Sequence, residues 1–263
     1  MAAILLPAVL LGLTDTVCLA ADVADTASPR TESVKDADRP VFTGSLYLWA
    51  AALEGTTSTL SSLPPAKIDL SFGDVLENLD GGIMGAAEMR AGQWRVLGDM
   101  MFTEVSPGGT LQGPSGADVE LRTRSFTLQG DVLYHFYGSE ALDLDAGAGL
   151  RFWYLHNKLS IDSGLVPGDI TSSDSEAWAD PVLAGRIRGR LGGSWDVTLV
   201  GDIGGFGVGS QLTWQVIGTL DYQCTENLAL RLGYRALSVD YEDGDVLYDV
   251  RMQGPIIGAT YRF

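Results

Sequence analysis

The chain ends Gln253-Gly254-Pro255-Ile256-Ile257-Gly258-Ala259-Thr260-Tyr261-Arg262-Phe263, so its last residue is aromatic. Counting back from Phe263 in steps of two gives apolar residues, whereas the residues between them, Arg262, Thr260 and Gly258, are polar or small. Because side chains of a strand alternate between its two faces, this segment predicts a strand with one apolar face. A terminal aromatic residue on that face, after many similar strands, favours a strand that closes a barrel in a membrane.

The same alternation recurs upstream. Between residues 142 and 154, Leu142, Leu144, Leu150 and other apolar residues share one face, and Asp143, Asp145, Gly147, Gly149 and Arg151 share the other. The sequence therefore predicts an all-β fold, a transmembrane antiparallel up-and-down β-barrel of ten strands, with eight or twelve as the alternatives. The expected strands cover 41–53, 81–91, 93–105, 118–138, 141–158, 175–190, 194–205, 209–223, 227–241 and 247–263.

The connections between these strands alternate in length. Short ones fall at 91–92, 138–140, 191–193 and 224–226, and longer ones at 54–80, 106–117, 159–174, 206–208 and 242–246. Outer-membrane barrels have short periplasmic turns and longer extracellular loops, so this asymmetry favours a membrane barrel over a soluble β-sandwich. The first long connection holds Ser71-Phe72-Gly73-Asp74, a capping box that predicts one short helix in the first extracellular loop.

Composition bounds the remaining organisation. Of 263 residues, 46% are hydrophobic and 19% charged, and no internal stretch approaches the roughly 18 consecutive apolar residues of a transmembrane helix. We expect a cleaved signal peptide at 1–21, a flexible periplasmic tail at 22–40 and the barrel at 41–263. The net charge of -17 argues against nucleic acid as a partner. After cleavage Cys224 is the sole cysteine, which excludes a disulfide framework or a thiolate metal site.

The polar faces of the expected strands carry both signs of charge in nearly equal number. Arginine dominates the cations, and its planar guanidinium suits bidentate pairing with carboxylates. Since an isolated ion inside a narrow barrel is costly, we expect these groups to pair as an interior network that fills the lumen or lines a thin water path. Its predicted members are Glu88, Arg90, Arg95, Asp99, Asp131, Asp145, Arg151, Arg186, Arg188, Asp202, Asp221, Arg231, Arg235 and Arg262, and the same faces also place Asp143, Asp180 and Asp196 inside.

Three segments, 71–80, 201–210 and 232–235, carry a resemblance to a family. They read Ser-Phe-Gly-Asp-Val-Leu-Glu-Asn-Leu-Asp, Gly-Asp-Ile-Gly-Gly-Phe-Gly-Val-Gly-Ser and Leu-Gly-Tyr-Arg, and they resemble a group of uncharacterised proteobacterial outer-membrane β-barrel proteins, related broadly to OmpA-like and porin-like barrels. Over residues 41–263 the resemblance implies a barrel in a Gram-negative outer membrane, in contact with lipid and lipopolysaccharide. It also implies that Tyr261 and Phe263 form a C-terminal signal for the barrel-assembly machinery. It implies no catalytic residues.

Other chemistry has weaker support. A hydrolase would need a nucleophile and a base in contact, but His156 and Ser160 lie about 13 Å apart along an extended strand. The glycine run 204–209 has strands on both sides, whereas a nucleotide-binding loop needs a following helix. The acidic segment 240–245, with Asp249 beyond it, could hold divalent cations, although a solvated hairpin is favoured. We therefore expect no enzyme activity and no cofactor.

Three functions stay open from the sequence. The first is a structural or surface-interaction barrel with a charge-paired, largely closed interior and acidic extracellular loops. The second is a narrow channel for ions or small solutes, whose charged lining would sort them. The third is a barrel enzyme that modifies lipid A.

Overall fold

The computed structural model describes residues 39–58, 65–106, 108–110, 118–162, 170–244 and 246–263. The expected signal peptide and residues 22–38 of the expected periplasmic tail lie outside them. Thirteen antiparallel strands form one sheet, and ten of them, all except β2, β3 and β6, close into a ring. The ring closes where β1 pairs with β13. Its strands are β1 (Val41–Trp49), β4 (Leu79–Ala91), β5 (Trp94–Val105), β7 (Asp118–Gly138), β8 (Leu142–Asp162), β9 (Ile170–Gly192), β10 (Trp195–Gly205), β11 (Leu212–Gln223), β12 (Leu228–Asp243) and β13 (Val246–Arg262). The predicted ten-stranded antiparallel barrel is confirmed.

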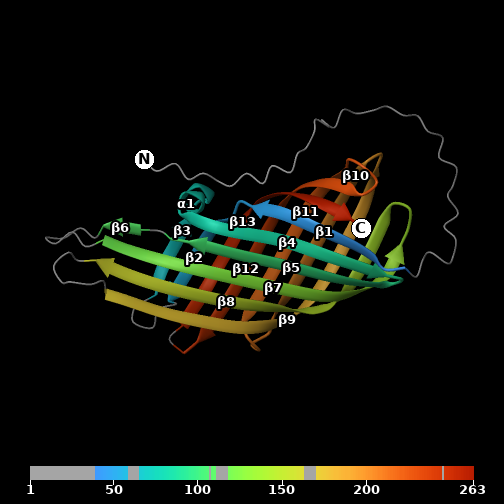
Figure 1. Ribbon diagram of the computed structural model, residues 1–263. Helices are drawn as coiled ribbons and strands as arrows, with labels where there is room; N and C mark the ends of the chain where they lie inside the picture. Colours follow the sequence, from blue (N-terminus) through green and yellow to red (C-terminus); the bar gives the residue numbers. More distant parts are fainter. Residues whose placement is uncertain (1–38, 59–64, 107, 111–117, 163–169, 245) are drawn as a thin grey trace.

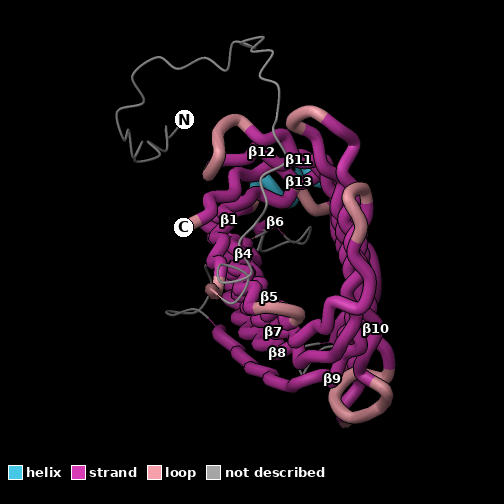
Figure 2. Tube along the Cα trace, turned by 90° about the vertical axis from the view of Figure 1, so that its right-hand side faces the viewer, coloured by secondary structure: helices cyan, strands magenta, loops and turns pink. Residues whose placement is uncertain are grey.

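The two ends of the barrel differ. The C-terminus, the start of β1 and the short turns between strands lie at one end, on the right of Figure 1. We call this end the lower end of the barrel and the opposite end, on the left of Figure 1, the upper end. Figure 2 looks along the barrel from the lower end and shows an oval ring of strands. Because each of the ten strands of the ring is hydrogen-bonded to a neighbour on both sides near the short-turn end, the ring has no open edge there, as a hydrocarbon environment requires. Within the described residues, no helix has the length and apolar character needed to cross a membrane.

The wall of the barrel is uneven in height. β7, β8 and β9 contain 21, 21 and 23 residues, and they extend toward the left end of Figure 1. β10 and β11 contain only 11 and 12 residues, about the length that crosses a bilayer at a tilt. β9 pairs with β10 only from Val182 onward, so its first part rises above the β10–β11 hairpin.

The upper end of the barrel carries four short extra elements: β2, β3 and α1 in the connection after β1, and β6 in the connection after β5. The first half of β13 pairs with β2 (Ala52–Ser58) and its second half pairs with β1. β1 and β2 therefore act as one strand that is interrupted at Ala50 and Ala51. β2 pairs with β3 (Ala66–Leu70), and β6 (Gly108–Thr110) pairs with β7. The predicted helix is confirmed as α1 (Phe72–Glu77), where the Ser71 side chain accepts from the Asp74 N–H and the Asp74 side chain accepts from the Ser71 N–H.

Two predicted loops are largely strand. The prediction of a loop over 159–174 was wrong for residues 159–162 and 170–174, because β8 runs to Asp162 and β9 starts at Ile170. The 242–246 connection shrinks to Gly244 and residue 245, which lies outside the described part. These segments are rich in Ser, Thr and Asp, a composition that is typical of loops. They are nevertheless strands, because their backbones pair with long neighbouring strands. The weakest predicted loop, 206–208, is longer than expected and spans 206–211.

An apolar belt surrounds the outside of the barrel. Its outward side chains are large and exposed, among them Leu46, Ile83, Leu150, Leu183, Leu232 and Ile257. Aromatic pairs mark its lower rim: Trp94 with Tyr134, Trp195 with Tyr222, and Tyr261 with Phe263, at ring-centroid distances of 5.2, 4.7 and 5.1 Å. An apolar band between aromatic girdles is the surface that a transmembrane barrel presents to lipid.

Candidate functional site: the lumen

The inward face of the lower barrel is polar because strand alternation sends the residues between the belt positions inward. On β8, for example, Leu150 and Phe152 are exposed to the outside while Arg151 is fully buried inside. The buried charges are held by three clusters and a set of pairs at the rim.

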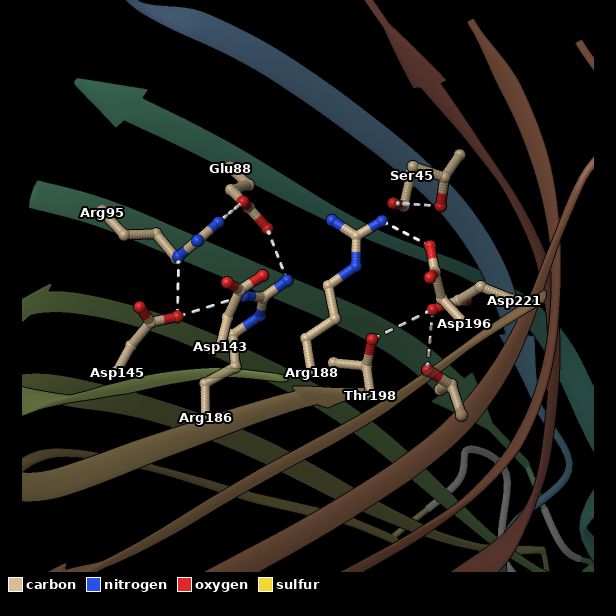
Figure 3. A network of polar contacts seen from close by, with 12 residues as sticks. Ser45, Glu88, Arg95, Asp143, Asp145, Arg186, Arg188, Asp196, Thr198 and Asp221 are labelled. Carbon is tan, nitrogen blue, oxygen red and sulfur yellow. Dashed lines mark hydrogen bonds and ion pairs between the residues drawn. The ribbon is translucent and has the colours of Figure 1, made fainter. Parts of the chain in front are cut away.

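The first cluster joins five strands near the short-turn end, and Figure 3 shows its four charged members. Asp145 on β8 accepts from Arg95 Nε on β5 and from Arg186 Nη1 on β9, each at 3.0 Å. Both arginines also contact Glu88 on β4. His135 Nδ1 lies 2.7 Å from the other Asp145 oxygen. Two guanidinium groups therefore face two carboxylates, and the cluster is charge-balanced without solvent.

The second cluster crosses the lumen at mid-height. Arg151 on β8 donates to Asp202 on β10 (2.7 Å), to Thr213 on β11 (2.8 Å) and twice to Gln129 on β7 (2.6 and 3.0 Å). The Gln129 and Gln215 amide groups donate to the second Asp202 oxygen at 3.0 and 3.2 Å. These side chains are all at least nine-tenths buried, so the layer joins β7, β8, β10 and β11 inside the lumen.

The third cluster lies on the other side of the lumen and borders the cavity described below. Arg235 on β12 donates to the Tyr47 hydroxyl (2.8 Å) and to Asp99 (3.0 Å), and the Tyr47 hydroxyl donates to Asp99 at 2.7 Å. The Arg235 guanidinium also lies 4.9 Å from the ring centroid of Trp49. This arrangement ties β1, β5 and β12 together through one buried cation.

Above these clusters the lumen is apolar. Trp178 on β9 stacks on Tyr241 of β12, with ring centroids 3.9 Å apart, and on Trp153 of β8 at 5.7 Å. Trp49, Leu155, Leu237, Val239 and Val250 belong to the same buried cluster. The stack joins β9 to β12 across the gap above the short β10–β11 hairpin. We call Trp153, Trp178 and Tyr241 the aromatic plug.

A buried carboxylate fixes the plug. Asp180 accepts from the indole N–H groups of Trp153 and Trp178 at 3.0 and 3.2 Å. It also accepts from the backbone N–H and hydroxyl of Ser210, at 2.6 and 2.8 Å, in the loop at the top of the hairpin. No cation pairs with Asp180 among the described residues, so hydrogen bonds alone hold its charge.

A cavity of about 130 Å³ lies below the plug, toward the short-turn end. Its lining includes Asp99, Asp131, Gln215, Arg231 and Arg235. Asp131 accepts from Gln129 at 2.9 Å and has no cation partner in the described structure. The cavity has room for a few water molecules.

The predicted site residues divide into several groups by position. Glu88, Arg95, Asp99, Asp145, Arg151, Arg186, Asp202 and Arg235 meet in the three clusters, with Asp131 beside the second. Arg188 pairs with Asp196 and Arg231 with Asp221, each at 2.6 Å, nearer the rim. Arg190, which was not predicted, pairs with Asp143. Arg90 and Arg262 are exposed and form no ion pair within the described residues.

The C-terminal pair continues the sheet. The Phe263 N–H donates to the Phe42 carbonyl at 2.9 Å, and both Tyr261 and Phe263 are exposed on the belt side. Their predicted part in barrel assembly stays a prediction.

The residues considered for other chemistry lie apart. His156 Nδ1 is 2.7 Å from the Ser175 hydroxyl on β9, not beside Ser160. Among the described residues no three His, Cys, Asp or Glu side chains are arranged to hold a metal ion, and Asp245 of the acidic hairpin lies outside that part. Divalent cations at this hairpin stay a prediction.

Sequence reasoning missed the uncharged partners and the plug. Gln129, Thr213 and Gln215 lie an even number of positions from charged inward residues of the same strands. The alternation that predicted the charged residues would therefore also have predicted these three. The plug was missed because the search followed polar residues: Trp153 follows Arg151 by two positions, and Trp178 precedes Asp180 by two.

No protein-family model matches the chain, and no curated protein matches its sequence. Among solved structures, the outer membrane protease OmpT from Escherichia coli is similar with a TM-score of 0.51 and 10% identity, over 85% of this chain and 97% of that one. Neisserial surface protein A is similar with a TM-score of 0.34 and 16% identity, over 85% of this chain and 97% of that one. Ail of Yersinia pestis is similar with a TM-score of 0.35 and 12% identity, over 85% of this chain and 98% of that one. The likeness to OmpT shows a shared barrel fold.

Proposed function

We propose that this chain is an exported outer-membrane β-barrel of structural or surface-interaction type whose lumen is closed. The apolar belt, its aromatic rim and the short turns at one end support the membrane location. The observation that carries the closed lumen is the buried layer around Arg151, which joins β7, β8, β10 and β11, with the aromatic plug above it. A solute would have to break both to cross.

The narrow channel is the second candidate, and the cavity of about 130 Å³ favours it in the periplasmic half. The two are separated by conductance. The chain from residue 22 is refolded in detergent, its heat-modifiable gel mobility is checked, and it is added to planar bilayers. We expect a folded barrel with no resolvable unitary current. A stable unitary current from the wild-type chain would replace the closed barrel with the channel.

The proposed partners are outer-leaflet lipid and, during assembly, the barrel-assembly machinery acting on Tyr261 and Phe263. We also propose that the chain is not an enzyme. The His156–Ser175 contact has no carboxylate orienting the imidazole among the hydrogen bonds of the described residues, whereas nucleophilic catalysis needs that third group. Replacing His156 with Ala should leave the lipid A species of a producing strain unchanged.

A further inference from the structure

The outer face of β5, β7, β8 and β9 changes character at one level. Paired outward residues run upward from Trp94 and Tyr134 at the lower rim to Phe102, Phe126 and Tyr154 at the upper rim. Tyr134 and Phe126 are eight residues apart (134 − 126), which is about 27 Å along a strand. At the usual strand tilt of about 35–45° these eight residues cover roughly 20 Å of the barrel axis, and the next outward residue, two positions further, lies at about 25 Å, the height of the apolar band of a membrane barrel. The side chains directly above Phe126 and Tyr154 therefore reach the layer of lipid headgroups.

The next two outward rows are basic. Arg124 is the register partner of Glu104 and His156, and one row higher Arg122 is the partner of Lys158. The residues between them face inward, since the Thr123 hydroxyl donates to the buried Asn157 at 2.7 Å. Arg122, Arg124 and Lys158 against Glu104 give these rows a net charge of +2, on a chain whose net charge is -17. We call Arg122, Arg124 and Lys158 the basic patch.

The patch is available to a ligand. The Arg122 and Arg124 side chains are 44% and 46% exposed. Arg124 donates to Glu104 at 3.0 Å; Arg122 donates to Glu120 at 3.1 Å and to the Ser106 hydroxyl at 3.3 Å, and lies 3.8 Å from Glu104. These contacts use part of each guanidinium. Lys158 is exposed and forms no ion pair among the described residues.

Among the described residues, the opposite wall has no net positive patch at this level. There the outward row at the level of Trp214 contains Arg251, which lies over the Trp214 ring and 3.9 Å from Glu54. The row above it pairs Asp240 with Asp249, and both are exposed. The same rows continue through β2 to Lys67 and Asp69 of β3, so they carry two cations, Arg251 and Lys67, against four carboxylates. In the described part of the chain, the border of the belt is therefore net negative here and net positive on the β7–β8 side.

We propose that the basic patch binds the phosphate groups of a phosphorylated outer-leaflet lipid, and so anchors the tall wall of the barrel in the headgroup layer. The proposal rests on the outer-membrane location in the proposed function. Two arguments carry it: charge complementarity with phosphate, and continuity with the belt, whose aromatic rim lies one row below. Guanidinium and ammonium groups are the usual partners of lipid phosphates.

The test uses the detergent-refolded chain and micelles that contain diphosphoryl lipid A, with binding followed by microscale thermophoresis. EDTA is present throughout, so that divalent cations cannot bridge phosphate to the acidic hairpin. The triple variant Arg122→Gln, Arg124→Gln, Lys158→Gln should bind at least about tenfold more weakly than the wild type. Arg90→Gln, an exposed charge at the periplasmic end, should bind as the wild type does. Glu104→Gln should bind more tightly, because it frees Arg124.

The tightened binding of Glu104→Gln cannot arise from a folding defect, so it separates recognition from lost structure. Dephosphorylated lipid A should bind the wild type as weakly as the phosphorylated form binds the triple variant. The proposal is overturned by equal affinity of the triple variant and the wild type, by an equal loss in Arg90→Gln, or by indifference to lipid phosphate. Displacement of lipid A by inorganic phosphate at equal concentration would also overturn it, in favour of a free-phosphate site. Heat-modifiable mobility of each variant tests the barrel itself independently.

Discussion

Replacing Arg151 with Met probes the layer that closes the lumen. The side chain is fully buried and makes four hydrogen bonds, one of them to Asp202, its partner in an ion pair. Met keeps much of the volume but leaves the Asp202 carboxylate with only the amide donors of Gln129 and Gln215. Breaking a buried pair from one side typically costs about 3–5 kcal/mol, because a buried charge is left without compensation. We expect a loss of that size in the free energy of unfolding.

A double-mutant cycle isolates the cause. Asp202→Asn alone leaves Arg151 without its carboxylate and should also destabilise the barrel, whereas Arg151→Met with Asp202→Asn leaves no uncompensated charge. The double variant should therefore lose less than the sum of the single losses, by about 2 kcal/mol or more. Urea unfolding in detergent, followed by tryptophan fluorescence, measures each value, and the exposed Arg90→Met should change stability by less than about 0.5 kcal/mol. Strict additivity, or a loss under about 1 kcal/mol for Arg151→Met, would refute the reasoning.

Three further outcomes follow from the described contacts. Asp180→Ala should destabilise the barrel by about 3 kcal/mol in the same urea assay, since it leaves the Ser210 and indole donors without their acceptor; an unchanged midpoint would contradict the role given to Asp180. Gly149→Ala should lower refolding yield, because its Cβ would lie 2.2 Å from a backbone carbonyl, whereas Gly81→Ala meets nothing within 4 Å and should refold normally. The Ser71 hydroxyl and N–H lower the pKa of Asp74 below its ordinary value, so the cap of α1 is intact at neutral pH and weakens as the pH falls through the depressed pKa. The protection factors of the α1 amides, which correct hydrogen exchange for its intrinsic pH dependence, should therefore fall at acid pH in the wild type. A Ser71→Ala chain whose protection factors show the same pH dependence would argue against the cap.

Period-two alternation was enough to predict the ring of strands. It works where one face meets lipid, because a one-residue slip would turn the whole apolar set inward. Alternation could not place the ends of β8 and β9. Beyond the belt, residues such as Ser160 and Ser173 carry no apolar signal, and only pairing with an equally long neighbour keeps them extended. Long-range pairing of this kind leaves no trace in local composition.

The charged lumen was predictable as a set, but its partners were not. Parity assigned Arg235 and Asp99 to the interior, yet they belong to strands on different parts of the ring and meet only because the barrel is narrow. The uncharged Tyr47 hydroxyl completes that contact. Which pairs form depends on barrel diameter and stagger, and these are properties of the closed sheet. Arg90 and Arg262 also have the alternation of inward residues, but they are exposed because they lie near the open short-turn end of the barrel. Alternation alone does not show how far a residue lies from that end.

The plug and the basic patch follow from a single inversion along β8. Up to Arg151 the strand is polar inside and apolar outside, as a barrel in lipid must be. From Trp153 to Leu159 the inward residues are apolar except for the buried Asn157, and from His156 the outside is polar. Above that point the wall has the polarity of a water-soluble protein, with Trp153, Leu155 and their neighbours as its buried core. The level of the inversion therefore marks the upper surface of the membrane, and the aromatic plug is the hydrophobic core that the tall wall needs in water. On this reasoning the closed lumen that we propose follows from extending the strands beyond the lipid, which a barrel with short walls would not require.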